Sequence, residues 1–176
     1  MLTKVTNSLF QGSIADAEEF KKTHPNEPFK FIGVLGANEL TAETPYDTLI
    51  PIRTKDNNTR IDITALNQTI DAIKKYHKEG FSVVVFCAAG VERSPLTAIY
   101  YLYKTNVLPI REAYQFYRTK RAILATVEQD ITDIELAEGG KQKYEREKPS
   151  RRVDRRRLEA VRKSARERTN RTNHAI

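Results

Sequence analysis

Hydrophobic positions recur most regularly in the middle of the chain, where they predict a helix followed by a buried strand. Over residues 62–79 the spacing alternates between three and four, so four side chains share one helical face: Leu66, Ile70, Ile73 and His77. Gly80 follows as a stop signal for that helix. Residues 81–86 are then almost uninterruptedly apolar, which is typical of a central strand covered on both faces.

Weaker patterns on both sides continue this alternation of strands and helices. Upstream, the sequence predicts four elements: a short edge strand within residues 4–12, a helix over 14–23 that Ser13 caps, a strand over 29–35 and a short strand over 48–52. Pro51 favours an edge position for this last strand or marks its end. Downstream, it predicts three helices, over about 94–105, 109–120 and 128–138. This order indicates an α/β domain in which a central, mainly parallel sheet is flanked by helices.

Charge is distributed unevenly and divides the chain after Gly139 and Gly140. The 176 residues together carry a formal charge of +7. Residues 141–176 contain 14 Lys and Arg but only five Asp and Glu, which gives +9, whereas residues 1–140 carry −2. We therefore expect a folded domain over 1–140 and a basic tail over 141–176, helical or disordered. Such a tail is suited to binding nucleic acid or another polyanion.

Composition also excludes several classes of protein. No apolar run approaches the roughly 20 residues of a membrane-spanning helix, and the first residues lack the apolar stretch of a signal peptide. Cys87 is the single cysteine, so a disulfide within the chain and a cysteine-rich zinc site are excluded. A reducing compartment is therefore expected, by default the cytoplasm, with the nucleus or a virion left open.

This cysteine ends the predicted central strand and precedes a short loop of mostly small residues. The loop consists of Ala88, Ala89, Gly90, Val91 and Glu92, and Arg93 and Ser94 follow at the start of the next helix. A turn of this kind directs backbone N–H groups and the helix dipole at one site, where an anion can bind. Arg93 can donate two hydrogen bonds to one oxyanion, and the same donors stabilise a thiolate at Cys87. The pattern predicts a phosphate-binding loop around a nucleophilic cysteine.

The alternative is a purely structural role, in which Cys87 is only a small buried hydrophobic residue. This is the usual role of a lone cysteine after an apolar strand. The combination of strand, cysteine, central glycine, Arg-Ser pair and following helix is much harder to obtain by chance. Residues 87–94, Cys-Ala-Ala-Gly-Val-Glu-Arg-Ser, resemble the Cys-x2-Gly-x2-Arg-Ser signature of the dual-specificity protein phosphatases, which belong to the protein tyrosine phosphatase superfamily.

The resemblance extends beyond this loop and covers about residues 5–138, without the tail. Residues 9–17 resemble the family's N-terminal strand and turn, residues 94–102 the helix after its loop, and residues 111–123 its next helix and closing turn. It implies the dual-specificity-phosphatase fold. Within the last segment, Arg121 could organise the pocket, contact a second phosphate or form a surface salt bridge.

The resemblance further implies hydrolysis in two steps, with no metal and no cofactor. Cys87 attacks phosphorus while Arg93 and the amides of the loop hold the phosphate oxygens, and water then hydrolyses the phosphocysteine with help from the Ser94 hydroxyl. Asp56, on a polar loop 31 residues before Cys87, has the family's spacing for the general acid. Its alternative role is that of a solvated turn residue. The rival, Asp62, starts the long helix, where a capping role is simpler.

Two residues depart from the family's pattern, Ala122 where proline is common and Phe86, and only the second bears on the chemistry. The family normally places a histidine directly before the nucleophile, where it supports the loop, and this chain has Phe86. Because the cysteine, the arginine and the serine are all retained, we expect an active enzyme. A pseudophosphatase that binds phosphate without turnover is the alternative.

The substrate is inferred from the size of the domain. It lacks room for the elements that build a deep, phosphotyrosine-only pocket, so proteins phosphorylated on serine, threonine or tyrosine are the expected substrates. An RNA 5′-triphosphatase-like enzyme recruited by the basic tail would keep the same chemistry, although the tail lacks interleaved aromatic residues for base stacking. Rhodanese-like and arsenate-reductase roles fit Asp56 and the Arg-Ser helix start less well.

Overall fold

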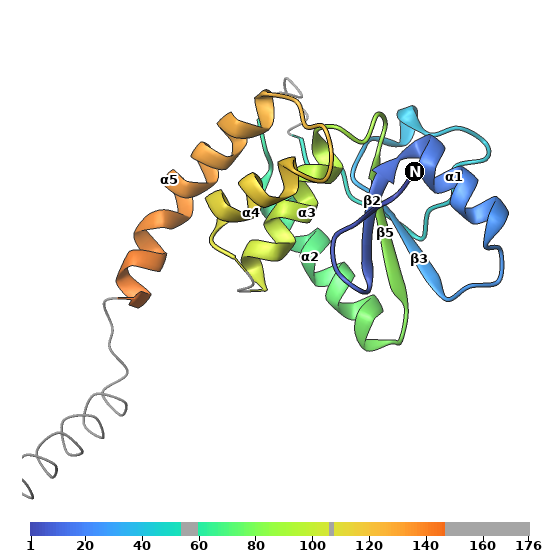
Figure 1. The fold of residues 1–176 in the computed structure, drawn as a ribbon, viewed down its shortest axis with the longest axis horizontal. Coiled ribbons are helices and arrows are strands. Elements are labelled where there is room, and N and C mark those ends of the chain that lie inside the picture. Colours follow the sequence, from blue (N-terminus) through green and yellow to red (C-terminus); the bar gives the residue numbers. More distant parts are fainter. Residues whose placement is uncertain (54–59, 106–107, 147–176) are drawn as a thin grey trace, which may run out of the picture. The chain divides into compact units, whose positions relative to one another are not determined.

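The structure of the protein, a computed structural model, describes residues 1–53, 60–105 and 108–146, with side chains as far as residue 138 (Figure 1). Two compact units are distinguished, Met1–Glu135 and Leu136–Ile176, and the fold below is that of the first. The predicted boundary after residue 140 falls within helix α5 (Thr126–Arg146) and stays a prediction. The helix considered for the tail beyond residue 146 lies outside the described residues.

A five-stranded sheet forms the centre of the first unit. Its strands lie in the order β1 (Thr3–Lys4), β2 (Leu9–Ser13), β5 (Ser82–Cys87), β3 (Phe29–Gly33) and β4 (Thr48–Leu49). Neighbouring strands are parallel except β1 and β2, which are antiparallel. The mainly parallel sheet is therefore confirmed, and the apolar run of residues 81–86 forms its central strand, β5, as predicted.

The strand predicted within residues 4–12 is present as β2, but its predicted position at the edge of the sheet is wrong. The chain turns after β1, where the backbone N–H groups of Val5 and Thr6 both donate to the carbonyl of Leu9. This turn folds β1 back onto β2, so β1 lies at the edge and β2 has a partner on each side. The poor hydrophobic alternation of residues 4–8 reflects this turn. At the other edge β4 lies as predicted, although it is shorter than residues 48–52.

Helices cover both faces of the sheet (Figure 1). Helix α1 (Ile14–Thr23) covers one face, and helices α2 (Ile63–Lys78) and α3 (Arg93–Lys104) cover the other, with α4 (Ile110–Arg118) packed against α3. Ser13 caps α1 and Asp62 caps α2, both as predicted. Helix α5 begins two residues before the predicted start and continues to Arg146. Among the described helices, none combines the length and apolar character needed to cross a membrane.

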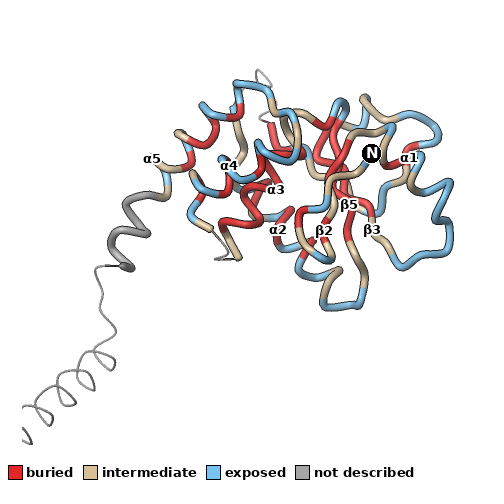
Figure 2. Tube along the Cα trace, in the orientation of Figure 1, coloured by how far each residue is buried: buried red, intermediate tan, exposed pale blue. Residues whose placement is uncertain are grey.

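Strand β5 is largely buried (Figure 2), and its two faces lie in separate hydrophobic clusters. Val83, Val85 and Cys87 face α2 and α3, whereas Val84 and Phe86 face α1. This alternation follows from strand geometry, in which successive side chains point to opposite faces. Packing therefore fixes the end of β5, from which the predicted site begins, on both sides.

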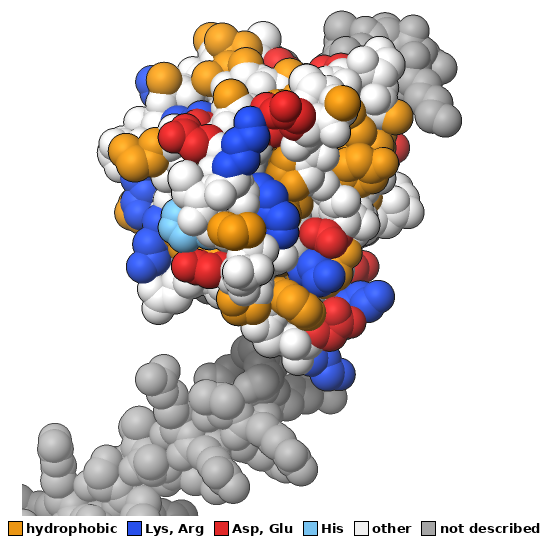
Figure 3. Space-filling view, turned by 90° about the vertical axis from the view of Figure 1, so that its right-hand side faces the viewer, with side chains coloured by type: hydrophobic (Ala, Val, Ile, Leu, Met, Phe, Trp, Pro, Cys, Tyr) orange, Lys and Arg blue, Asp and Glu red, His pale blue; other side chains and the backbone are white. Residues whose placement is uncertain are grey.

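The surface carries charges of both signs. Figure 3 shows Lys and Arg side chains interspersed with Asp and Glu side chains and with apolar residues over one face of the molecule. Such mixing agrees with the formal charge of −2 carried by residues 1–140.

Candidate active site

The loop between β5 and α3 is packed tightly against the end of β2. Gly90 adopts a φ of +71°, a conformation that side-chain-bearing residues rarely adopt. A Cβ atom at this position would lie 2.7 Å from the backbone nitrogen of Ser13 and 2.8 Å from the carbonyl carbon of Gly12. Both the backbone conformation and the lack of space therefore require glycine, which explains its place in the predicted loop.

The backbone N–H groups of this loop are available for a ligand. Within the described residues, none of the N–H groups of residues 88–92 donates a hydrogen bond to the protein. They precede the first turn of α3, where N–H groups also lack partners within the helix. Successive free N–H groups beside a helix N-terminus form an anion-binding arrangement. The loop can thus hold a phosphate group, as the sequence predicts.

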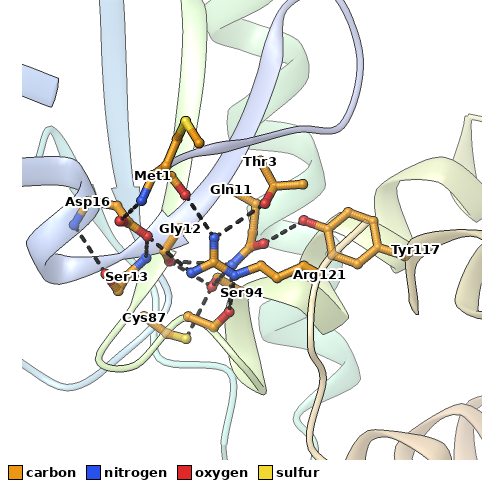
Figure 4. A network of polar contacts seen from close by, with 11 residues as sticks. Met1, Thr3, Gln11, Gly12, Ser13, Asp16, Cys87, Ser94, Tyr117 and Arg121 are labelled. Carbon is orange, nitrogen blue, oxygen red and sulfur yellow. Dashed lines mark hydrogen bonds and ion pairs between the residues drawn. The ribbon is translucent and has the colours of Figure 1, made fainter. Parts of the chain in front are cut away.

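Cys87 and Ser94 lie together beneath this loop (Figure 4). The Cys87 side chain is buried, and its Sγ lies 3.1 Å from the Ser94 Oγ. The Ser94 Oγ also lies 3.0 Å from the carbonyl oxygen of Gly12, which accepts its hydrogen. The structure therefore brings the predicted nucleophile within hydrogen-bond distance of the hydroxyl expected to assist it.

Gln11 joins this pair and was missed by sequence reasoning. Its Nε2 donates to the Ser94 Oγ over 2.8 Å and to the Gly90 carbonyl over 3.0 Å, and its Oε1 accepts from the Tyr117 hydroxyl (Figure 4). Gln11 and Tyr117 are both fully buried. The available signal was a polar residue directly after the apolar Leu9 and Phe10 in a predicted strand, since a buried amide requires hydrogen-bond partners.

Arg121 contacts both the loop and a carboxylate, in agreement with two of the three roles considered for it, organising the pocket and forming a salt bridge. Its Nε donates to the Gly90 carbonyl over 2.9 Å, and its Nη2 donates to the Asp16 carboxylate over 3.0 Å. Burial raises the pKa of Asp16, but hydrogen bonds from the N-terminal ammonium, Ser13 and Arg121 outweigh it and hold that pKa well below its usual range. The carboxylate therefore stays ionised and anchors Arg121 near the loop.

Arg93 is held by a carboxylate that the sequence analysis did not single out. Both of its Nη atoms donate to Glu39, each over 2.7 Å. Glu39 ends the short 3-10 helix η1 (Ala37–Glu39) after β3. The hydrogen bonds from Arg93 lower the pKa of Glu39 below its ordinary value. A guanidinium carries five N–H groups, so this pairing orients Arg93 and leaves further donors for an oxyanion.

A cleft of about 600 Å³ adjoins the loop at Arg93. It is lined by residues 34–39, residues 51–53 and Arg93. At its rim, the guanidinium of Arg53 donates to both carboxylate oxygens of Asp130 over 2.8 Å and pairs with Glu92 of the loop. The segment that leads toward the predicted general acid is thereby tied to the predicted phosphate-binding loop.

Three further sequence predictions bear on the site. Asp56 lies outside the described residues, so its role as general acid stays a prediction. Asp62, its rival, accepts a hydrogen bond from the Ala65 N–H over 3.0 Å and caps α2, as expected. Phe86 is fully buried in the cluster beneath α1, on the face opposite to Cys87.

Within the described part of the chain, no three His, Cys, Asp or Glu side chains are grouped so that they could hold a metal ion.

A mainly parallel α/β fold with a Cys-x5-Arg loop between its central strand and a helix is typical of cysteine phosphatases. The model of the dual specificity phosphatase catalytic domain matches residues 14–132 of this chain. The chain therefore belongs to the dual specificity phosphatase family.

Individual relatives agree with this assignment over shorter segments. Dual specificity protein phosphatase 5 of Rattus norvegicus is 33% identical over 76 residues, which is 43% of this chain and 19% of that protein. Dual specificity protein phosphatase 1 of Homo sapiens is 34% identical over 71 residues, which is 40% of this chain and 19% of that protein. The matched segments span about a fifth of the length of these relatives.

Solved structures share the fold at low sequence identity. A mouse putative dual specificity phosphatase, complexed with zinc tungstate, matches with a TM-score of 0.63 and 17% identity over 80% of this chain and 90% of that chain. The human tyrosine phosphatase-like serine/threonine/tyrosine-interacting protein matches with a TM-score of 0.60 and 20% identity over 77% of this chain and 96% of that chain. At these identities the likeness concerns the fold alone.

Proposed function

We propose that this chain is a metal-independent cysteine phosphatase that hydrolyses phosphoserine, phosphothreonine and phosphotyrosine in proteins. The observation that carries the proposal is the set of backbone N–H groups at residues 88–92, directly after Cys87. These groups donate to no acceptor in the part of the chain that the structure describes. Membership of the dual specificity phosphatase family supports a phosphoprotein substrate. The small domain favours a site open to all three phosphorylated side chains.

In the first step, the Cys87 thiolate forms a bond to phosphorus while the bond from phosphorus to the leaving oxygen breaks. The loop N–H groups and Arg93 hold the other phosphate oxygens and balance their charge, so no metal is needed for that purpose. Asp56 donates a proton to the leaving oxygen. The products are the dephosphorylated side chain and a phosphocysteine.

In the second step, water attacks the phosphocysteine and the sulfur leaves with the bonding electron pair. Asp56, now ionised, takes the proton of that water. The Ser94 hydroxyl, 3.1 Å from the sulfur, donates a hydrogen bond to the departing thiolate. Inorganic phosphate is released, and Cys87 is ready for the next substrate.

The direct test uses the full chain with phosphopeptides that carry labelled phosphate on serine, threonine or tyrosine. We expect release of phosphate, and a labelled covalent intermediate when the reaction is quenched in acid. Cys87→Ser should abolish both, with a loss of at least about 10⁴-fold in turnover, because the nucleophile is gone. Its circular dichroism should match that of the wild type, because serine is close in volume to cysteine.

Two further measurements separate the competing functions. Release of phosphate from 5′-triphosphate RNA at a rate at least equal to that from phosphopeptides would overturn a protein substrate, and a steep fall of that rate with salt would implicate the basic tail. Binding of phosphopeptides without release and without a covalent intermediate would instead indicate a pseudophosphatase.

A further inference from the structure

Gln11 is a polar side chain in an otherwise hydrophobic position. It lies on β2 opposite Val85 of β5, so it points to the same face of the sheet as Val85 and Cys87. Its exposed fraction is zero. Burying an amide is costly unless its donors and acceptor are all satisfied, and here the amide contacts the Ser94 hydroxyl, the Gly90 carbonyl and the Tyr117 hydroxyl.

The orientation of this amide is fixed by its neighbours. The Gly90 carbonyl can only accept a hydrogen bond, so the Nε2 of Gln11 and not its Oε1 must face it. On the other side, the Tyr117 hydroxyl donates to the Oε1. Burial raises the pKa of Tyr117 well above its ordinary value, so this phenol keeps its proton and remains a donor. Both ends of the amide therefore require the same orientation.

This orientation restricts the hydrogen of the Ser94 hydroxyl. Because the Ser94 Oγ accepts a hydrogen bond from Gln11, its own hydrogen must point elsewhere. Two acceptors lie within reach, the Gly12 carbonyl at 3.0 Å and the Cys87 Sγ at 3.1 Å. The single hydrogen of the Ser94 hydroxyl can therefore bond to either acceptor, and a negative charge on the sulfur favours the bond to sulfur.

We propose that Gln11, anchored by Tyr117, is a positioning residue that directs the Ser94 hydroxyl toward the Cys87 sulfur whenever that sulfur is a thiolate. The inference rests on the proposed phosphatase function. While the Cys87 sulfur is bonded to phosphorus, it is a poor hydrogen-bond acceptor. The Ser94 hydroxyl then donates its hydrogen to the Gly12 carbonyl. As the sulfur–phosphorus bond breaks and its electron pair returns to sulfur, the hydrogen turns to the thiolate and stabilises it.

The test compares Gln11→Met, which keeps the volume of the side chain but removes its donors and acceptor, with Tyr117→Phe, which removes only the anchor. Tyr114→Phe is the matched control, because Tyr114 is buried on the same helix, one turn away, and outside this network. Since Cys87 is the single cysteine, its ionisation is followed by the ultraviolet absorbance of the thiolate, with Cys87→Ser as the blank. Single-turnover kinetics with a labelled phosphopeptide separate formation of the phosphocysteine from its hydrolysis.

We expect Gln11→Met to move the midpoint of thiolate formation up by about one pH unit and to slow hydrolysis of the phosphocysteine about tenfold, the effect of losing one hydrogen bond to a charged group. Tyr117→Phe should act in the same direction and less strongly. Tyr114→Phe should leave both quantities unchanged. In a Ser94→Ala background Gln11→Met should have no further effect on hydrolysis, because its route through the hydroxyl is already gone.

Either of two results overturns the inference: an unchanged midpoint in Gln11→Met, or a loss in hydrolysis that persists undiminished in the Ser94→Ala background. If Gln11→Met does not fold, the midpoint of thiolate formation in Tyr117→Phe tests the inference, and an unchanged midpoint overturns it. If the wild type releases no phosphate, the proposed function fails, while the thiolate titration still tests the hydrogen bond by itself.

Discussion

Phe86 and Cys87, the last two residues of β5, point to opposite faces of the sheet and have opposite surroundings. Phe86 lies in a cluster of apolar side chains beneath α1, whose buried members are Ala17, Phe31, Leu35 and Val84. Cys87 also packs in a hydrophobic cluster, but its sulfur contacts a chain of hydrogen bonds that leads through Ser94 and Gln11 to Tyr117 (Figure 4).

This contrast explains the departure from the family's pattern. The position that the family fills with histidine faces a cluster that offers apolar side chains, and a phenyl ring fits such surroundings better than an imidazole. The polar support of the candidate nucleophile lies on the other face of the strand. Both faces of β5 thus pack in hydrophobic clusters, but only the face of Cys87 also carries, among the described residues, hydrogen bonds that lead to the sulfur.

The largest expected effect on stability comes from removing the Phe86 ring from the apolar cluster beneath α1. Phe86→Ala should lower the free energy of unfolding by about 3–5 kcal/mol, because it removes a fully buried ring and leaves a cavity. Chemical denaturation measures the loss. Turnover per folded molecule should change much less, because the ring points away from the sulfur.

Two other substitutions at this position serve as controls. Phe86→Leu should retain most of the stability, because it fills much of the same volume. Phe86→His should destabilise the protein without raising turnover. A gain in turnover with Phe86→His would contradict the expectation that the residue at position 86 contributes to packing and not to catalysis.

A smaller effect is expected from the loop on the polar side. Gly90→Ala should cost about 1–3 kcal/mol from its backbone conformation and more from contact with the end of β2, and it should weaken phosphate binding. Gly80→Ala is the matched control, since Gly80 has a φ of +91° but nothing within 4 Å of an added Cβ. Denaturation and phosphate release are measured for both. Equal losses of stability, or equal turnover, would show that the close approach at Gly90 is unimportant.

The smallest effect is expected from the carboxylate that orients Arg93. Glu39→Gln should reduce turnover a few-fold, through weaker orientation of the guanidinium. Because Arg93 lowers the pKa of Glu39 in the folded protein, the pair stabilises the fold above the unfolded value of about 4.5 and loses that contribution as pH falls through the lower folded pKa.

The wild type and Glu39→Gln should therefore differ in stability at neutral pH and converge in acid. Denaturation at several pH values tests this expectation. Glu43→Gln, which removes an exposed pair with Lys22, should leave turnover unchanged. Turnover of Glu39→Gln equal to that of the wild type would show that Arg93 needs no such partner.

Much of the fold and part of the site could be predicted because their signals are local. Periodicity located α2 and β5, capping chemistry located Ser13 and Asp62, and the motif from Cys87 to Ser94 located the loop. Each of these depends on neighbours within a few residues along the chain, where hydrophobic spacing and backbone preferences act directly.

What only the tertiary structure decided are the contacts between distant segments. Gln11 meets Tyr117 across 106 positions and Ser94 across 83, and Glu39 meets Arg93 across 54. No local pattern encodes such pairs, because they arise only when β2, β5, α3, α4 and η1 are brought together. The sequence by itself determined that a cysteine ends a central strand before a short glycine-containing loop and a helix. Packing of the sheet and helices decided which side chains orient that cysteine and its arginine.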